Sequence, residues 1–404
     1  MIYVGIDWAE AHHDVCVEDE TGAVVLRRRI ADGLDGVAQL HAALAERASS
    51  ATEIVIGIET DRGLLVQALV AAGYELYVIN PFSLSRYRER HVTSGAKSDA
   101  GDAKVLADLV RADRHNHRRI AGDSVLAQAV KVLARTHQSL IWARQRQVNA
   151  MRNALREFYP GALGAFGADL DSPDALAVLT IAPTPEEART LTVARIVRAL
   201  RAGGRERFLE RRARVIHATL RRPQLGGSPV VSSAYGEAVR SMARIVASLA
   251  SEIARLEEEL KARFEQHPDA EILRSLPGLG LILGARVLGE FGDDPTRYPD
   301  PRSRRCYAGS APITKASGTK MVVLARYARN RRLADACYLW AFSAISRSAG
   351  ARRYYDRQRA CGRSHHQALR ALSNRLVGIL HGCLRHRRLY SEEIGWGSQP
   401  AAAA

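Results

Sequence analysis

The sequence predicts a mixed α/β domain at the N-terminal end, followed by a mainly helical remainder. Over about the first 110 residues, short apolar runs alternate with segments that have helical spacing of apolar residues. From Asp99 onward the pattern turns helical and mostly stays so. At 404 residues the chain is long enough for about two to three domains.

The predicted elements of the N-terminal domain follow a recognisable order. Strands are expected at 2–6, around Val15 and Val17, and at 24–30, and Glu20-Thr21-Gly22 joins the last two as a hairpin. A helix at 34–47, a strand at 53–58, a helix at 64–72 and a strand at 74–79 come next, with Gly73 and Asn80-Pro81 as stop signals. Three strands followed by helix, strand, helix and strand is the order of the ribonuclease-H-like fold.

The rest of the chain divides by pattern. One long helix is expected at 126–158, so the N-terminal domain is placed at 1–158. Residues 159–232, broken by prolines and glycine pairs, form an insert or linker of unknown role. A coiled-coil segment at 233–266, a mainly α-helical C-terminal domain at 267–390 and a disordered tail at 391–404 complete the prediction.

The coiled-coil segment is predicted from a heptad-like stripe. Apolar residues recur there at alternating spacings of three and four, with charged residues between them. The stripe consists of Val239, Met242, Val246, Leu249, Ile253, Leu256 and Leu260. Such a seam favours self-association into a dimer or tetramer, and the alternative is an amphipathic helix packed inside its own domain.

Charge indicates a polyanionic partner. The formal net charge is +16, and a balance of this kind bears on partners rather than on fold. From Gly318 to Arg388 there are sixteen Lys and Arg residues and only two acids, Asp335 and Asp356. Because so one-sided a stretch repels itself unless phosphates neutralise it, we expect nucleic acid as the partner, although a solvated basic face is the plainer alternative.

Four carboxylates predict a metal-dependent site. Asp7 and Glu59 each follow an apolar strand, and residues at the carboxyl ends of neighbouring parallel strands share one crevice. Asp99 and Asp102 are three apart at the start of a helix and therefore lie on one face of it. All-oxygen ligands suit Mg²⁺ or Mn²⁺ rather than zinc. Taken singly, Asp99 and Asp102 could serve only to cap the helix or interact with its dipole.

These segments resemble a known family. G-I-D-W-A-x(4)-D at 5–14, I-E-T at 58–60, V-I-N-P at 78–81 and K-S-D-A-G-D-A at 97–103 are similar to the RuvC-like DEDD domain of IS110-family insertion-sequence transposases. L-P-G-L-G at 276–280 and Y-A-G-S-A-P-I-T-K-A-S-G at 307–318 are similar to the C-terminal domain of that family. The resemblance covers roughly 1–155 and 270–385. It implies a transposase guided by a bridge RNA that pairs with donor and target DNA.

The resemblance also has departures and consequences for single residues. Trp8 stands where a smaller residue is commoner, and Asp61 is an extra acid that competes with Glu59 as a candidate ligand. Ser317, which by itself suggests only a Ser-Gly turn, aligns with the serine that the family uses as its nucleophile.

Further residues are candidates for nucleic-acid contact. Gly278 and Gly280 precede an apolar helix, as in a helix-hairpin-helix, where glycines let backbone N–H groups approach a phosphate; an ordinary Gly-rich loop is the alternative. Basic residues near Ser317 and towards the following helix suit contacts with the phosphates of a nucleic-acid backbone. They are Lys315, Lys320, Arg326, Arg329, Arg331 and Arg332.

The leading functional hypothesis is a DNA transposase or recombinase with a two-metal DEDD site and a serine nucleophile. One alternative is a RuvC-like endonuclease that acts through metal-activated water; the other is a non-catalytic nucleic-acid-binding protein. Neither a membrane span nor a secretory signal is recognisable, so a cytoplasmic location is expected. Five scattered cysteines without a C-x-x-C pair argue against zinc and disulfides.

Overall fold

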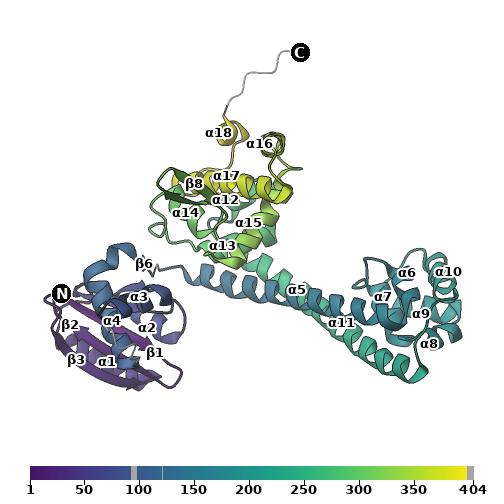
Figure 1. The fold of residues 1–404 in the computed structure, drawn as a ribbon, viewed down its shortest axis with the longest axis horizontal. Coiled ribbons are helices and arrows are strands. Elements are labelled where there is room, and N and C mark those ends of the chain that lie inside the picture. Colours follow the sequence, from purple (N-terminus) through teal and green to yellow (C-terminus); the bar gives the residue numbers. More distant parts are fainter. Residues whose placement is uncertain (92–97, 121, 398–404) are drawn as a thin grey trace, which may run out of the picture. The chain divides into compact units, whose positions relative to one another are not determined.

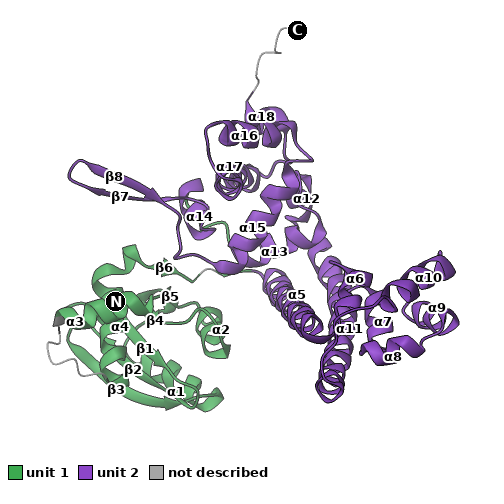
Figure 2. Cartoon of the chain, turned by 45° about the vertical axis from the view of Figure 1, so that its right-hand side comes forward, with its two compact units in different colours: residues 1–123, 294–299 green, residues 124–293, 300–404 purple. Residues whose placement is uncertain are grey.

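The computed structural model describes residues 1–91, 98–120 and 122–397. Lys97 of the K-S-D-A-G-D-A motif and residues 398–404 of the expected tail lie outside this set. The chain forms two compact units, which Figure 2 shows in different colours. Unit 1 holds Met1–Asp123 and Asp294–Pro299, and unit 2 holds Ser124–Asp293 and Asp300–Ala404.

Unit 1 is a six-stranded mixed sheet with helices. The strands are β1 (Ile2–Trp8), β2 (His12–Glu18), β3 (Val24–Ala31), β4 (Ile54–Ile58), β5 (Glu75–Val78) and β6 (Arg118–Arg119). The helices are α1 (Leu34–Ala45), α2 (Leu64–Ala71), α3 (Pro81–His91) and α4 (Asp99–Asp113), with short 3₁₀ helices η1 (Ala51–Glu53) and η2 (Arg114–Asn116). The strand order is β3-β2-β1-β4-β5-β6, with β1, β4 and β5 parallel and the other pairs antiparallel. The predicted strands and helices of this region are thus confirmed.

The sheet of unit 1 buries apolar side chains on both faces, as the nearly continuous apolar runs of β1 and β4 require. Val4, Ile6 and Ile56 pack with residues of α1 and α2 on one face. On the other face, Val55 and Tyr77 pack with residues of α3 and α4.

Unit 2 is helical apart from one hairpin. Its helices begin with α5 (Val125–Phe158), α6 (Pro160–Phe166), α7 (Pro173–Ile181), α8 (Pro185–Thr190), α9 (Val193–Ala202), α10 (Leu209–Leu220) and α11 (Pro229–Glu265). They continue with α12 (Ala270–Ser275), α13 (Leu281–Phe291), α14 (Pro301–Tyr307), α15 (Arg331–Ala344), α16 (Ala349–Ala360), α17 (His365–His386) and α18 (Glu392–Trp396). The hairpin is formed by β7 (Ile313–Ser317) and β8 (Lys320–Leu324).

Helix α5 has about the predicted length and lies in unit 2. Its buried face packs against α11 and α13. Gly289 of α13 lies so close to the backbone of Lys131 that a Cβ there would be 2.8 Å from the Lys131 Cα. The first stretch of the N-terminal compact unit ends at Asp123, and the domain boundary at residue 158 stays a prediction.

Helix α11 carries the apolar stripe that suggested a coiled coil. It runs beside α5 in the opposite direction (Figure 1), and Val239, Val246 and Leu260 are completely buried within the single chain. Phe264, just past the stripe, packs on Gly284 of α13. The stripe thus has partners inside its own chain, as the alternative interpretation expects, and self-association stays a prediction.

Residues 159–232, predicted as an insert or linker, form short helices within unit 2. Helices α6 to α10 surround the C-terminal half of α5 and the N-terminal half of α11 and share one hydrophobic core with them. Buried Asp174 of α7 accepts hydrogen bonds from Arg205 and Arg212, which ties α7 to the start of α10. The prolines and glycines that made this region hard to interpret separate short helices rather than marking a loop.

The C-terminal end is ordered further than expected. Residues up to Gly397 are described, and α18 lies in the segment predicted to be a disordered tail. Trp396 donates a hydrogen bond to the Tyr390 hydroxyl and packs against Gly350, which explains the order. Among the helices of the described ranges, none combines the length and apolar character needed to cross a membrane.

Candidate active site

The acidic site depends on how closely α4 approaches the sheet. Gly5 of β1 and Gly57 of β4 are register partners on neighbouring parallel strands. A Cβ on Gly5 would lie 1.8 Å from the carbonyl oxygen of Ala103, and one on Gly57 would lie 2.7 Å from that of Leu106. Because both positions lack a side chain, the backbone of α4 rests directly on the strands.

Strand register places Asp7 and Glu59 together. Ile6 pairs with Ile58 in the parallel ladder, so Asp7 and Glu59 are the next residues along each strand. Asp7 is the penultimate residue of β1 rather than the residue after it, and Glu59 directly follows β4. Both side chains are half-buried.

Helix α4 contributes the other two predicted acids. Ser98 caps its N-terminus by accepting a hydrogen bond from the Gly101 N–H at 3.1 Å, so capping does not fall to Asp99. Asp102 is buried and Asp99 is exposed, which matches their positions one turn apart on a helix packed against the sheet.

Electrostatics shows that these carboxylates interact. The pKa of Asp7 rises to about 6, first because burial disfavours its charge and then because Asp102, Glu59 and Asp99 repel it, as does Asp14. The other three predicted acids therefore lie within electrostatic range of Asp7. A cluster of this kind is stabilised by bound cations.

Two arginines partly balance the cluster. Arg88 of α3 is ion-paired with Asp102. Arg29 of β3 donates two hydrogen bonds to Asp14, at 3.2 and 2.9 Å, and its Nη2 lies 4.0 Å from Asp99. These contacts hold the side chains of Asp102 and Asp14 in fixed positions.

Asp14 was not predicted as a site residue, although it ends the G-I-D-W-A-x(4)-D motif. It is the cross-strand partner of Asp7 in the antiparallel pair β1–β2. Its carboxylate, Asp99 and His12 bring ligand atoms within 4.8 Å of one another, a spacing that could hold a metal ion. In the sequence, Asp14 follows Asp7 by seven residues across a short turn. This spacing could have indicated that the two residues pair across neighbouring strands.

Asp61 lies in a different environment from the cluster. Arg118 of β6 donates a hydrogen bond of 2.7 Å to its Oδ2, and the Arg62 Nε lies 3.5 Å from its Oδ1. Glu59, by contrast, contributes to the raised pKa of Asp7. Of the two acids in this segment, the geometry therefore favours Glu59 as the candidate ligand.

Ser317 lies at the end of an exposed hairpin in unit 2. It is the last residue of β7, and Gly318, with φ of 55°, starts the two-residue turn to β8. Ser317 is paired with Lys320, and Lys315 lies two residues before it, so the three side chains share one face of the ribbon. The ribbon is solvent-exposed along most of its length (Figure 2).

Gly278 and Gly280 have different environments. Gly278 has φ of 82°, and a Cβ there would lie 2.7 Å from the backbone nitrogen of Ala344, so it is needed for packing against α15. Gly280 precedes α13 with open space around it. At Gly278, the space in which a phosphate was expected to approach the backbone is thus taken by α15.

The predicted arginines are only partly available to a ligand. Arg332 donates to the carbonyl of Arg135, to Gln138 and to Ser139, and it stacks on Trp142, so it joins α15 to α5. Arg326 donates to the carbonyl of Ala311. Arg329 and Arg331 are exposed and line a pocket, and the exposed Lys315 and Lys320 flank Ser317. Arg332 thus has a structural role in this chain, and its predicted contact with nucleic acid stays a prediction.

Comparisons with known proteins match two parts of the chain to transposase families. Residues 4–160 match a model described as a transposase, of the DEDD type found in IS110, and residues 270–356 match a model of the IS116/IS110/IS902 transposase family. With these two matches in order along one chain, the protein is a transposase, an enzyme that acts on DNA.

Full-length relatives define the family. The mini-circle protein of IS117 from Streptomyces coelicolor, named as a transposase, is 44% identical over 100% of this chain and 98% of its own. A 42 kDa protein of insertion element IS900 from Mycobacterium paratuberculosis is 30% identical over 96% and 97%. The transposase of IS1111A from Coxiella burnetii is 23% identical over 80% and 71%. The chain belongs to the IS110/IS116/IS902 family of insertion-sequence transposases.

Proposed function

We propose that this transposase cuts and rejoins the DNA ends of its insertion sequence through Asp7, Glu59, Asp99 and Asp102, with Ser317 as the nucleophile. The observation that carries the proposal is the register of β1 and β4, which sets Asp7 beside Glu59, with α4 packed on the same two strands. The raised pKa of Asp7 agrees with this crowding. The strand order of unit 1, with its antiparallel hairpin edge and parallel centre, supports a ribonuclease-H-like, RuvC-like fold.

The four acids fit divalent metal. Their donor atoms are all oxygens, which suits Mg²⁺ or Mn²⁺. Arg88 and Arg29 contact Asp102 and Asp99, so the negative charge of the half-buried Asp7 is poorly compensated. Bound divalent ions supply positive charge that assists attack on a phosphate and stabilises the leaving oxygen. Within the protein, the register of β1 and β4 fixes Asp7 beside Glu59, and Arg88 orients Asp102.

The hairpin supports the role of Ser317. Its Oγ attacks a scissile phosphate, and an Oγ–P bond forms as a P–O bond to a deoxyribose oxygen breaks. The Oγ proton is released to solvent, and the leaving oxygen takes up a proton from solvent to become a free hydroxyl. Lys315 and Lys320 on the same face attract the phosphate and favour the ionised hydroxyl. The phosphoserine link retains the energy of the broken bond for rejoining the strand.

The partners belong to the same proposal. DNA ends and target are the substrates, a bridge RNA selects them by base pairing, and the enzyme works as a dimer or tetramer. The strongly basic C-terminal region supports nucleic-acid binding. Omitting the RNA is expected to abolish cleavage.

Ser317→Ala and Asp7→Ala are each expected to lack cleavage when assayed alone. If different chains contribute Ser317 and Asp7 to one reaction, a mixture of the two variants is expected to recover cleavage.

A denaturing gel tests the nucleophile. Protein, Mg²⁺, guide RNA and labelled element-end DNA are incubated, denatured and examined for DNA attached covalently to protein. The wild type is expected to give an adduct, and Ser317→Ala none. Thr314→Ala, which removes a hydroxyl from the opposite face of the same hairpin, is the matched control and is expected to keep the adduct.

Other outcomes support the alternatives. Cleavage without an adduct, unchanged in Ser317→Ala, would indicate a RuvC-like endonuclease in which water attacks. DNA binding that is unchanged in Asp7→Ala, with no cleavage under any condition, would leave a non-catalytic nucleic-acid-binding protein.

A further inference from the structure

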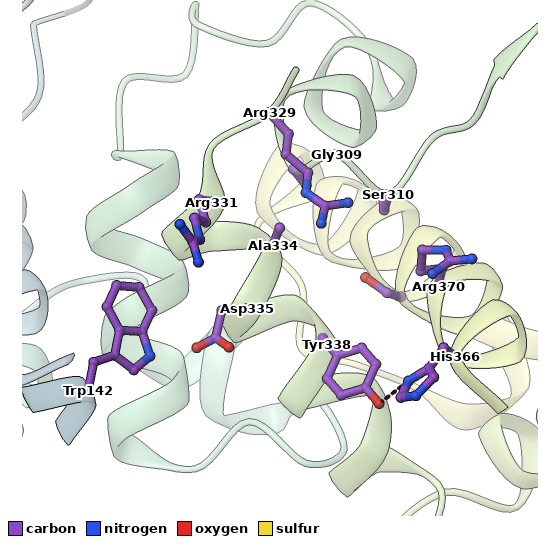
Figure 3. Close-up of a pocket in the computed structure, with 12 residues that line it drawn as sticks. Trp142, Gly309, Ser310, Arg329, Arg331, Ala334, Asp335, Tyr338, His366 and Arg370 are labelled. Carbon is purple, nitrogen blue, oxygen red and sulfur yellow. Dashed lines mark hydrogen bonds between the residues drawn. The ribbon is translucent and has the colours of Figure 1, made fainter. Parts of the chain in front are cut away.

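A pocket of about 350 Å³ opens on unit 2, away from the hairpin that carries Ser317. It is lined by α5, the loop after α14, the start of α15 and the start of α17 (Figure 3). This volume is at the lower end of the range for small-molecule sites, about 300–1,000 Å³. The pocket is therefore large enough for a single nucleotide but not for a duplex.

One wall of the pocket is aromatic and held in place. The guanidinium group of Arg332 lies 5.0 Å from the centre of the Trp142 ring, so one face of the indole is occupied by the protein. Tyr338 lies across from Trp142 in Figure 3, and its hydroxyl is hydrogen-bonded to Nδ1 of His366 at 2.8 Å. Rings fixed in this way can stack on a base with little loss of side-chain entropy.

Between these rings lies one carboxylate, that of Asp335 (Figure 3). The Gln138 amide donates a hydrogen bond to its Oδ2 at 2.8 Å, and Arg332 donates to the Gln138 Oε1 at 3.3 Å. This chain of contacts fixes the orientation of the carboxylate. A carboxylate only accepts hydrogen bonds, so it selects a base edge that presents N–H donors.

The remaining sides of the pocket are basic. Arg329, Arg331 and Arg370 line it, against the single acid Asp335. Arg329 lies over Gly309, where a Cβ would be 2.2 Å from the Arg329 Cδ, so the glycine makes room for this side chain. The Arg329 Nη1 also donates a hydrogen bond to the Arg326 carbonyl at 3.1 Å. Guanidinium groups at the rim, one of them held by the Arg326 carbonyl, suit a phosphate.

We propose that this pocket binds one unpaired guanine nucleotide of the DNA or RNA held by the transposase. The base stacks on Trp142, its adjacent N1–H and N2–H donors meet the two oxygens of Asp335, and its phosphate lies on Arg329, Arg331 and Arg370. The inference rests on the proposed function only in requiring that the chain binds nucleic acid. It is independent of the acids of unit 1 and of Ser317.

Fluorescence anisotropy at one fixed salt concentration tests the pocket. The probes are a fluorescein-labelled DNA duplex with a single bulged G, the same duplex with bulged A, C, T or an abasic site, the fully paired duplex, and the RNA counterparts. The wild type is expected to bind the bulged-G probe about tenfold more tightly than the abasic one, from stacking and base-edge contacts. The DNA and RNA arms show which nucleic acid supplies the nucleotide.

Two variants separate the pocket from general affinity. Asp335→Asn keeps an acceptor for Gln138 and is expected to bind bulged G no more tightly than bulged A, C or T, with paired-duplex binding unchanged. Trp142→Ala is expected to weaken every bulged base and not the abasic probe, whereas Trp142→Phe retains stacking. Arg353→Ala, an exposed arginine outside the pocket, is the control and is expected to weaken all probes alike.

Equal wild-type affinity for bulged, abasic and paired probes would overturn the pocket proposal while leaving the proposed function standing. So would an Asp335→Asn variant that melts like the wild type and keeps the preference for G. Failure of the wild type to bind any probe, together with no cleavage, would overturn the pocket proposal and the proposed function together.

Discussion

Gly5 and Gly57 lie side by side on parallel strands, and together they let helix α4 rest its backbone on the sheet. This contact sets the height of Asp99 and Asp102 above the strand ends that carry Asp7 and Glu59. The candidate site of unit 1 therefore depends on two residues that have no side chain.

Gly5→Ala is expected to destabilise the protein by about 2–3 kcal/mol, because the new Cβ would overlap the carbonyl oxygen of Ala103 and push α4 outward. Urea unfolding followed by circular dichroism measures this loss. Gly122→Ala is the control, since a Cβ there meets open space. Equal stability of the two variants would show that α4 does not need the close approach.

Divalent metal binding is expected to weaken as the pH falls through about 6. The folded pKa of Asp7 lies above its unfolded value of about 3.9. Ionisation of Asp7 therefore destabilises the folded protein progressively as the pH rises from about 4 to about 6. Because metal requires the ionised form, Mn²⁺ affinity at pH 5 is expected to be about tenfold below that at pH 7. Calorimetric titration of the DNA-free protein measures it.

In EDTA at pH 7, Asp7→Asn is expected to be more stable than the wild type by about 1–2 kcal/mol, after allowance for solvent screening of a half-buried group. The same variant is expected to lose the rise in melting temperature that Mn²⁺ gives the wild type. A variant that is less stable without metal would contradict the repulsion inferred among the carboxylates.

Glu59→Gln is expected to abolish cleavage, and Asp61→Asn to retain most of it. The reason is that Asp61 is hydrogen-bonded to Arg118, whereas Glu59 acts on Asp7. Cleavage rates on labelled element-end DNA at saturating Mg²⁺ compare the two neutral, nearly isosteric changes. The opposite ranking would assign the ligand to Asp61.

Arg332→Ala is expected to destabilise unit 2 by about 1–3 kcal/mol, because it leaves the Arg135 carbonyl and Ser139 without this partner and removes the stack on Trp142. Thermal unfolding gives the loss. Arg331→Ala, an exposed neighbour, is the control and is expected to change stability by less than about 0.5 kcal/mol. A stable Arg332→Ala variant with weaker DNA binding would instead show that Arg332 contacts nucleic acid, as the sequence predicts.

The sequence by itself determined most local structure. Strand and helix patterns of unit 1, the length of α5 and the helix of α11 follow from apolar periodicity, which depends on neighbours a few residues apart. The acids Asp7, Glu59, Asp99 and Asp102 were predicted because each lies at the end of a strand pattern or in the first turn of a helix pattern. The family was apparent from short motifs in their order along the chain.

Only the tertiary structure decided which surfaces meet. The apolar stripe of α11 is the same whether its partner is another chain or α5, so periodicity could not choose. Arg332 and Arg331 look alike in sequence, and only packing against α5 separates a structural arginine from an exposed one. Asp14 joins the acids through cross-strand pairing, and the pocket of Trp142 and Asp335 unites residues nearly two hundred positions apart. Long-range contacts of this kind depend on how whole elements pack, which no short window of sequence contains.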